Sequence, residues 1–154
     1  MRLNGSETAH RIGGEREIAL AYWLLKSEPG SYGWPDLVRD GGTEWDGVRN
    51  HAAAGHLRAM REGDLALFYH SGADKAAVGV ARIARAARPD GDQGWVSVAV
   101  EPVEPLPRPV TLAAMKADPR LAGMAMIRQS RLSVSPVTDA EWAALMELAQ
   151  DAAA

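Results

Sequence analysis

The stretch Trp45-Asp46-Gly47-Val48-Arg49-Asn50 places an aromatic ring, a carboxylate, a guanidinium and an amide within six residues. It lies between two short helical patterns, and Asn50 is a good N-cap candidate for the second, so a loop between helices is predicted. Gly47 can adopt backbone angles closed to other residues and lets this loop turn sharply. Such groups on a rigid scaffold suit a planar polar heterocycle next to a phosphate. The alternative is structural: Trp45 belongs to the core, and Asp46 and Arg49 only fasten the loop.

The composition is that of one globular domain with a core, because 47% of the 154 residues are hydrophobic. The chain has no cysteine, which excludes disulfides and thiolate chemistry and fits the reducing cytoplasm, where we expect the protein. No apolar run approaches the roughly 18–20 residues that cross a bilayer, so no membrane partner is expected. Residues 1–20 lack the apolar segment of a signal peptide and are predicted to be a disordered leader before a domain over residues 21–150.

The net charge of −3 excludes a polybasic nucleic-acid binder. Residues 105–136 nonetheless carry five basic side chains against Asp118 alone, a local charge of +4. Such a face allows a few phosphate contacts, and a solvated face without a partner explains it equally well. Binding to an unmodified duplex should therefore be weak and strongly salt-dependent.

Hydrophobic patterning predicts about five strands. The first is a continuous apolar run typical of a central strand covered on both faces, and the second and third form a hairpin. They are expected at residues 21–26, 65–70, 77–86, 95–100 and 132–135. The prolines Pro102, Pro105, Pro107 and Pro109 predict an extended connector outside the sheet.

Short helices are predicted between and after these strands. They are expected at residues 34–39, 50–60 and 111–116, with a further turn or helix from Asp118-Pro119. The capping box Thr138-Asp139-Ala140-Glu141 opens a last helix, whose apolar stripe comprises Trp142, Leu145, Met146 and Ala149. This order indicates an α+β fold, either a small curved mixed sheet or an open barrel with helices outside.

The usual enzyme signatures are absent, including phosphate-cradling and dinucleotide-binding glycine loops, nucleophile elbows and zinc-protease motifs. We expect no cofactor. The spacing of His51 and His56 places them on different faces of a helix, so no metal site is expected either.

The end of the predicted strand 65–70 is a candidate ligand site. Alternation points Phe68 and His70 to one side and Tyr69 to the other. Adjacent in sequence, His70 and Ser71 do not suit a base–nucleophile pair, so either ligand hydrogen bonding or strand-end packing is expected.

Other polar and aromatic residues allow more than one role. Glu28 could bind a base edge, pair with Arg49 or cap a helix. Among the tryptophans, Trp34 and Trp45 stand where an aromatic ring can line a pocket or stack on a base. Core positions are expected for Trp23, Trp95 and Trp142.

Several motifs, taken in order, resemble the EVE domain family. They are Tyr22-Trp23-Leu24-Leu25-Lys26-Ser27-Glu28-Pro29, the stretch 45–50, Leu57-Arg58-Ala59-Met60, Gly63-Asp64, Phe68-Tyr69-His70-Ser71, Val78-Gly79-Val80-Ala81, Pro109-Val110-Thr111-Leu112 and Arg131 to Thr138. The resemblance spans about residues 21 to 150.

The resemblance implies a PUA-like fold, a small curved β-barrel of about five strands flanked by short helices. It also implies a pocket for a modified nucleobase of DNA or RNA, with stacking on a ring and polar groups reading the base edge. The implied site residues are Lys26, Ser27, Trp45, Val48, Arg49, Asn50, Phe68, Tyr69, His70 and Ser71, with Arg131 as a phosphate or loop-fixing partner.

The sequence departs from the family pattern after Asn50. The family usually continues with tyrosine, glutamine, alanine, arginine and asparagines, whereas this chain has His51-Ala52-Ala53-Ala54-Gly55-His56. Plausible stacking and phosphate contacts are thereby lost, so a changed affinity or ligand choice on an intact fold is expected.

The leading hypothesis is a non-catalytic reader of a modified base, with no catalytic residues. A second hypothesis is a small hydrolase or nuclease that uses His70, Glu28 or Asp46 as acid–base groups. A third is a protein-interaction module whose basic segment 105–136 meets an acidic partner.

Overall fold

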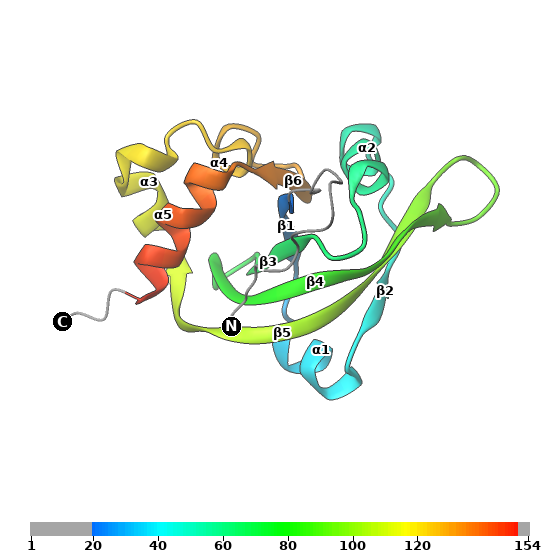
Figure 1. The fold of residues 1–154 in the computed structure, drawn as a ribbon, viewed down its shortest axis with the longest axis horizontal. Helices are drawn as coiled ribbons and strands as arrows, with labels where there is room; N and C mark the ends of the chain where they lie inside the picture. Colours follow the sequence, from blue (N-terminus) through cyan, green and yellow to red (C-terminus); the bar gives the residue numbers. More distant parts are fainter. Residues whose placement is uncertain (1–19, 151–154) are drawn as a thin grey trace, which may run out of the picture.

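The computed structural model describes residues 20–150, which form one six-stranded sheet with helices on both of its faces (Figure 1). The strands are β1 Tyr22–Ser27, β2 Thr43–Trp45, β3 Leu65–His70, β4 Ala76–Pro89, β5 Val96–Thr111 and β6 Val134–Val137. The helices are α1 Trp34–Asp40, α2 His51–Ala59, α3 Leu112–Ala117, the 3₁₀ turn η2 Pro119–Leu121, α4 Ala125–Arg128 and α5 Asp139–Gln150. No helix within the described range is long and apolar enough to cross a membrane. Of the predicted leader over residues 1–20, all but Leu20 lies outside this range.

The sheet is mixed and open. Its strand order is β2-β5-β4-β3-β1-β6, in which β1 and β3 are parallel and every other pair is antiparallel. The predicted α+β class and strongly curved mixed sheet are confirmed, but there are six strands and they do not close into a barrel. The added strand is β2, whose three residues are too few to show a period-2 pattern.

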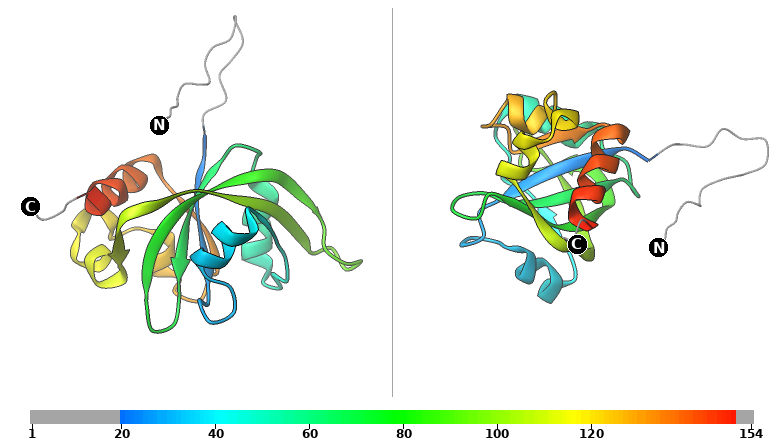
Figure 2. Two further views of the ribbon diagram at one scale, coloured as in Figure 1. Left: turned by 90° about the horizontal axis from the view of Figure 1, so that it is seen from below. Right: turned by 90° about the vertical axis from the view of Figure 1, so that its left-hand side faces the viewer.

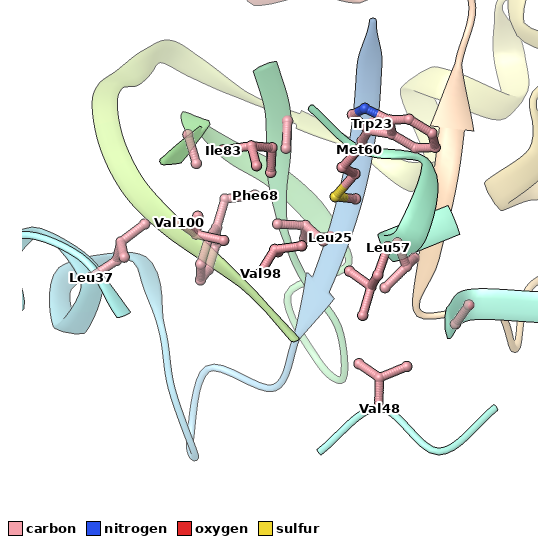
Figure 3. Close-up of a cluster of buried hydrophobic side chains, with 14 of the residues drawn as sticks. Trp23, Leu25, Leu37, Val48, Leu57, Met60, Phe68, Ile83, Val98 and Val100 are labelled. Carbon is pink, nitrogen blue, oxygen red and sulfur yellow. The ribbon is translucent and has the colours of Figure 1, made fainter. Parts of the chain in front are cut away.

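Side-chain alternation along the central strands builds two hydrophobic cores. Trp23, Leu25 and Phe68 face the core beneath α1 and α2, where Figure 3 shows several of these side chains converging. Leu24 and Tyr69 face the opposite core, which α3, α4 and α5 cover. Burial on both faces explains the continuous apolar run of β1, as predicted. Figures 1 and 2 place α3 and α5 at one end of the molecule and the β4–β5 hairpin tip at the other.

The prediction that the proline series forms a connector outside the sheet was wrong. Pro102, Pro105, Pro107 and Pro109 all lie within β5, where Pro105 is opposite Gly79 and Pro102 is opposite Ala81 of β4. Because β2 covers β5 only between Val98 and Val100, the proline-rich half of β5 has a single strand neighbour. Proline is tolerated on such an edge, where its missing N–H is not needed, and several register shifts against β4 mark the irregularity.

The predicted helix caps are confirmed. The Asn50 side chain accepts a hydrogen bond from the Ala53 N–H, and Thr111 does the same for α3. In the capping box of α5, Thr138 and Glu141 exchange side-chain and backbone hydrogen bonds of 3.0 and 3.1 Å. The last strand begins two residues later than predicted, at Val134, because Leu132 belongs to the turn after α4.

The parallel pairing of β1 and β3 positions the candidate site. Parallel strands end at the same edge of a sheet, so Ser27 lies opposite His70, and the Ser71 N–H donates to the Ser27 carbonyl at 2.9 Å. The polar groups predicted at the two strand ends therefore meet at one place.

Candidate functional site

A pocket of about 240 Å³ lies beside Trp45, at the end of β1 and along β2. Its lining comprises Ser27, Tyr32, Thr43, Glu44, Trp45 and Asp46. The half-buried Trp45 indole meets the Phe68 ring edge-on, with centroids 5.6 Å apart and planes at 85°. Because Phe68 is fully buried, the indole is held by the core, and the pocket has one rigid aromatic wall.

Hydrogen bonds fix the polar wall of this pocket. The Ser27 hydroxyl donates to the Tyr32 carbonyl at 2.5 Å, and the Tyr32 hydroxyl donates to Asp40 at 2.9 Å. Partial burial, together with the bond to Asp40, raises the pKa of Tyr32. Tyr32 thus stays a neutral phenol. Because the Ser27 hydroxyl donates its hydrogen, its oxygen can still accept a hydrogen bond from a ligand.

The two carboxylates in the lining differ in their partners. Glu44 accepts two bonds from the Arg85 guanidinium, at 2.9 and 2.7 Å, and a third from the Ser97 hydroxyl. The Arg85 hydrogen bonds lower the pKa of Glu44 to about 2. Asp46 is exposed, and no described residue forms a hydrogen bond or ion pair with its carboxylate. Asp46 is therefore the carboxylate in this lining that is free for a ligand.

The loop from Asp46 to Asn50 is tied to the β4–β5 hairpin through Asp90. One Asp90 oxygen accepts from the Gly47 N–H at 2.9 Å and from Arg49 at 3.0 Å, and the Gly47 bond is the main cause of a lowered Asp90 pKa. Gly47 has φ +77°, the left-handed conformation expected of the sharp turn. Arg49 therefore fastens the loop, as the predicted structural alternative had it. Its ion-pair partner is Asp90 and not Glu28.

His70 has both ring nitrogens engaged at the end of β3. Its Nε2 accepts from the backbone N–H of Trp34 at 3.0 Å, and its Nδ1 lies 3.1 Å from an Asp74 oxygen. An acceptor at Nε2 makes Nδ1 the protonated nitrogen, so His70 donates to Asp74. This geometry favours strand-end packing, the second of the two roles expected for His70.

Two further predicted site residues lie in the core. Phe68 is completely buried, and Val48 is 9% exposed and points from its loop toward the cluster around Leu57 (Figure 3). Phe68 supports the Trp45 wall of the pocket from the core side. The predicted direct contact of Phe68 and Val48 with a ligand is not tested by this arrangement.

Two of the tryptophans differ from their expected environments. Trp34 is 9% exposed and packs so closely on Gly79 that a Cβ there would lie 2.6 Å from its ring, so it is a core residue. Trp95 is only half-buried. It stacks on His51 with centroids 4.8 Å apart and lies 5.5 Å from the Arg49 guanidinium. Trp23 and Trp142 are core residues, as predicted.

The remaining predicted residues line two neighbouring pockets. Asn50 and Arg131 line one of about 370 Å³, together with Ala52 and residues 129–132. Lys26, Tyr69 and Ser71 line another of about 280 Å³ on the opposite face of β1, and Ser130 borders both. The structure therefore distributes seven of the eleven predicted residues over three pockets, whereas Val48, Arg49, Phe68 and His70 line none of them.

Sequence reasoning missed Tyr32, Thr43, Glu44 and Asp90. Thr43 enters through the pairing of β2 with β5, and Asp90 reaches the loop from a hairpin 43 residues away from Gly47. No local pattern marks such long-range partners. Tyr32 could have been noticed as an aromatic residue in the turn directly after Ser27. Among residues 20–150, no group of three or more histidine, aspartate or glutamate side chains is placed to hold a metal ion.

Comparison with known proteins identifies relatives of this chain. The model of the EVE domain family matches residues 21–148. Thymocyte nuclear protein 1 from Gallus gallus is 32% identical, over 90% of this chain and 73% of its own length. The NMR structure of Rpa0253 from Rhodopseudomonas palustris is 50% identical with a TM-score of 0.81, and covers 84% of this chain and 93% of that one.

A crystal structure of human THYN1 protein in complex with 5-methylcytosine-containing DNA is also similar. It is 29% identical with a TM-score of 0.79, over 84% of this chain and 98% of that one. The match in fold confirms the PUA-like architecture that the sequence motifs implied. The family match over nearly the whole described range, with relatives above 30% identity, shows that this chain belongs to the EVE domain family.

Proposed function

We propose that this protein binds a nucleic acid carrying a modified base, and that the base enters the Trp45 pocket without being chemically changed. The observation that carries the proposal is the pocket of about 240 Å³ with a core-supported indole wall and polar groups opposite. Its volume lies below the roughly 300–1,000 Å³ of sites for drug-sized ligands, which suits one extruded base. The complex of the similar human protein with 5-methylcytosine-containing DNA supports this choice of ligand.

The polar groups of the pocket suit the edge of a base that carries an exocyclic amine. Asp46 offers a carboxylate free of partners in the described structure, and carboxylates accept hydrogen bonds from the exocyclic amine of cytosine. The Ser27 oxygen adds a second acceptor. Asn50, whose side-chain oxygen caps α2, keeps its NH₂ group for a ligand in the adjoining pocket. Stacking on Trp45 would contribute about 1–3 kcal/mol.

The hydrolase alternative receives no support from the arrangement around His70. A general base needs a free ring nitrogen near the substrate, and both nitrogens of this buried ring already have partners.

The test is fluorescence anisotropy with short DNA and RNA oligonucleotides, each modified base paired with its unmodified twin at fixed salt. The wild-type protein should prefer one modified strand. Trp45→Ala should abolish the preference, whereas Trp45→Phe, which keeps a ring on Phe68, should retain most of it. Equal preference in Trp45→Ala would show that the base binds elsewhere.

Asn50 needs a control that separates its two roles. Asn50→Ala removes both the helix cap and the NH₂ group and should cost about 1 kcal/mol of stability. Asn50→Asp keeps a capping oxygen but cannot donate. If Asn50 reads the ligand, both variants weaken binding; if it only caps α2, Asn50→Asp binds like the wild type. Circular dichroism checks that each variant is folded.

A further inference from the structure

Lysine is rare in this chain and is gathered at one place. Of the 17 basic residues, 14 are arginine and only Lys26, Lys75 and Lys116 are lysine. All three line the pocket of about 280 Å³ on the face of β1 opposite Trp45. They come from the end of β1, the turn after β3 and the last turn of α3. Tertiary structure thus brings together residues that are 49 and 41 positions apart.

The lysines surround a floor that is largely apolar, formed in part by Tyr69 and Met126. Lys26 is the most buried of the three, and burial lowers its pKa. Its Nζ donates to the Ser130 carbonyl at 2.5 Å and lies 5.9 Å from the centre of the Tyr69 ring. An ammonium group has three donors, so Lys26 retains donors for an anion in the pocket.

The lysines are not neutralised in the way the arginines are. Among residues 20–150, ion pairs with described carboxylates are formed by Arg39, Arg49, Arg82, Arg85, Arg88 and Arg120. Within residues 20–150, no such pair involves a lysine. One carboxylate comes near the rim: an oxygen of Glu28 lies 3.2 Å from where a Cβ on Gly72 would stand. The pocket therefore holds a net positive charge.

The backbone at Lys75 is held in an unusual conformation. Its φ of +46° makes it the one non-glycine residue with positive φ in the described range. Its carbonyl accepts the Leu112 N–H at 2.8 Å, which fixes this turn against the start of α3. A non-glycine residue in the left-handed region is strained, and such strain is found at binding sites more often than elsewhere.

We infer that the lysine pocket, lined by Lys26, Lys75 and Lys116, binds a backbone phosphate of the nucleic acid whose base enters the Trp45 pocket. Lys26 and Ser27 are consecutive residues of β1 with opposite side-chain directions, so the two pockets meet at the end of one strand. Compact ammonium groups from three directions suit a tetrahedral anion. The position of this phosphate relative to the base rests on the proposed function.

The test compares two double variants that remove the same charge. Lys75→Gln/Lys116→Gln removes two of the three positive charges of the pocket. Arg39→Gln/Arg82→Gln removes two positive charges outside the pocket, on side chains that are 65% and 45% exposed. Anisotropy titrations use the modified and unmodified oligonucleotides at several salt concentrations. The lysine variant should bind both strands roughly tenfold more weakly, with the modified-to-unmodified ratio unchanged. The slope of log K against log[salt] should fall by about 0.7–0.9 per lost phosphate contact. Glu28→Gln should strengthen binding of both strands.

The outcomes separate this inference from the proposed function. If the wild type prefers no modified base but the lysine variant still loses affinity and salt slope relative to the arginine variant, base reading fails and the phosphate site stands. If the two double variants behave alike, the phosphate site is refuted, whatever the base preference.

Chemical labelling gives an independent readout because no other lysine exists in the chain. Acetylation with an amine-reactive reagent, followed by mass spectrometry, should be slowed at all three lysines by the oligonucleotide. Equal protection by inorganic phosphate alone would mean a site for the free anion and overturn the link to nucleic acid. No protection by the oligonucleotide would overturn the site itself.

Discussion

Replacement of His70 by alanine should cost stability, not a specific contact with the ligand. The substitution leaves the Trp34 N–H without its acceptor in a buried environment, at a cost of about 1–3 kcal/mol. It also removes an edge contact with Phe68 at 5.7 Å between ring centroids, worth about 0.5–1.5 kcal/mol. The bond to Asp74, whose side chain is 53% exposed, adds less than about 1 kcal/mol. The expected loss is therefore about 3 kcal/mol.

Urea unfolding followed by tryptophan fluorescence measures this loss. With an m-value of about 1–3 kcal/mol per molar urea, the midpoint should fall by about 1–3 M at unchanged m. His70→Gln, which offers a side-chain oxygen to the Trp34 N–H, should recover part of the loss. His51→Ala is the matched control. That ring is exposed and stacks on Trp95, so its loss should cost under about 1 kcal/mol.

The reasoning is refuted if His70→Ala unfolds within about 0.5 kcal/mol of the wild type while losing oligonucleotide binding. That result would mean that the imidazole gives up its hydrogen bond from the Trp34 N–H and binds the ligand instead, so that His70 belongs to the binding surface.

Two further perturbations test the packing and the electrostatics around the Trp45 pocket. Gly79→Ala places a methyl group 2.6 Å from the Trp34 ring and should lower stability by about 1–3 kcal/mol, whereas Gly55→Ala, with nothing within 4 Å, should raise it by roughly 0.5–1 kcal/mol. Thermal melts that shift equally for both would contradict the close packing on Gly79. Because the folded-state pKa of Glu44 is lowered from 4.5 to about 2, its contribution to stability is present above pH 4.5 and disappears as the pH falls toward 2. Glu44→Gln should therefore flatten the acid limb of a stability–pH profile, and an unchanged limb would show that the Arg85 pair contributes nothing.

Local signals predicted most of the elements correctly. The side chains of the caps Asn50, Thr111 and Thr138 each accept a hydrogen bond from the backbone N–H three residues later. Such short-range chemistry can be recognised in a single sequence. The period-2 pattern of residues 65–70 gave the correct faces for Phe68 and Tyr69, which lie in opposite cores.

Local sequence patterns could not predict which strands pair or which residues pack on each other over long distances in the chain. Proline argues against a central strand. Only the shortness of β2 leaves an open edge on β5, where Pro102 and Pro105 lie opposite residues of β4 and Pro107 and Pro109 continue the strand. Trp34 and Trp95 exchanged their expected environments because burial depends on what packs above a residue. Trp34 lies over Gly79, 45 residues away, whereas Trp95 lies at a hairpin tip with a partly open face.

The sequence by itself determined the helices and their caps, the strand faces and the family, because each depends on residues close together or on motifs in a fixed order. Only the tertiary structure decided the partners. It pairs Arg49 with Asp90 and places the His70 ring in hydrogen-bonding distance of both Trp34 and Asp74. It also brings three lysines from three segments into one pocket. The physical reason is that alternation tells which way a side chain points, whereas its neighbours depend on how strands pair across the sheet.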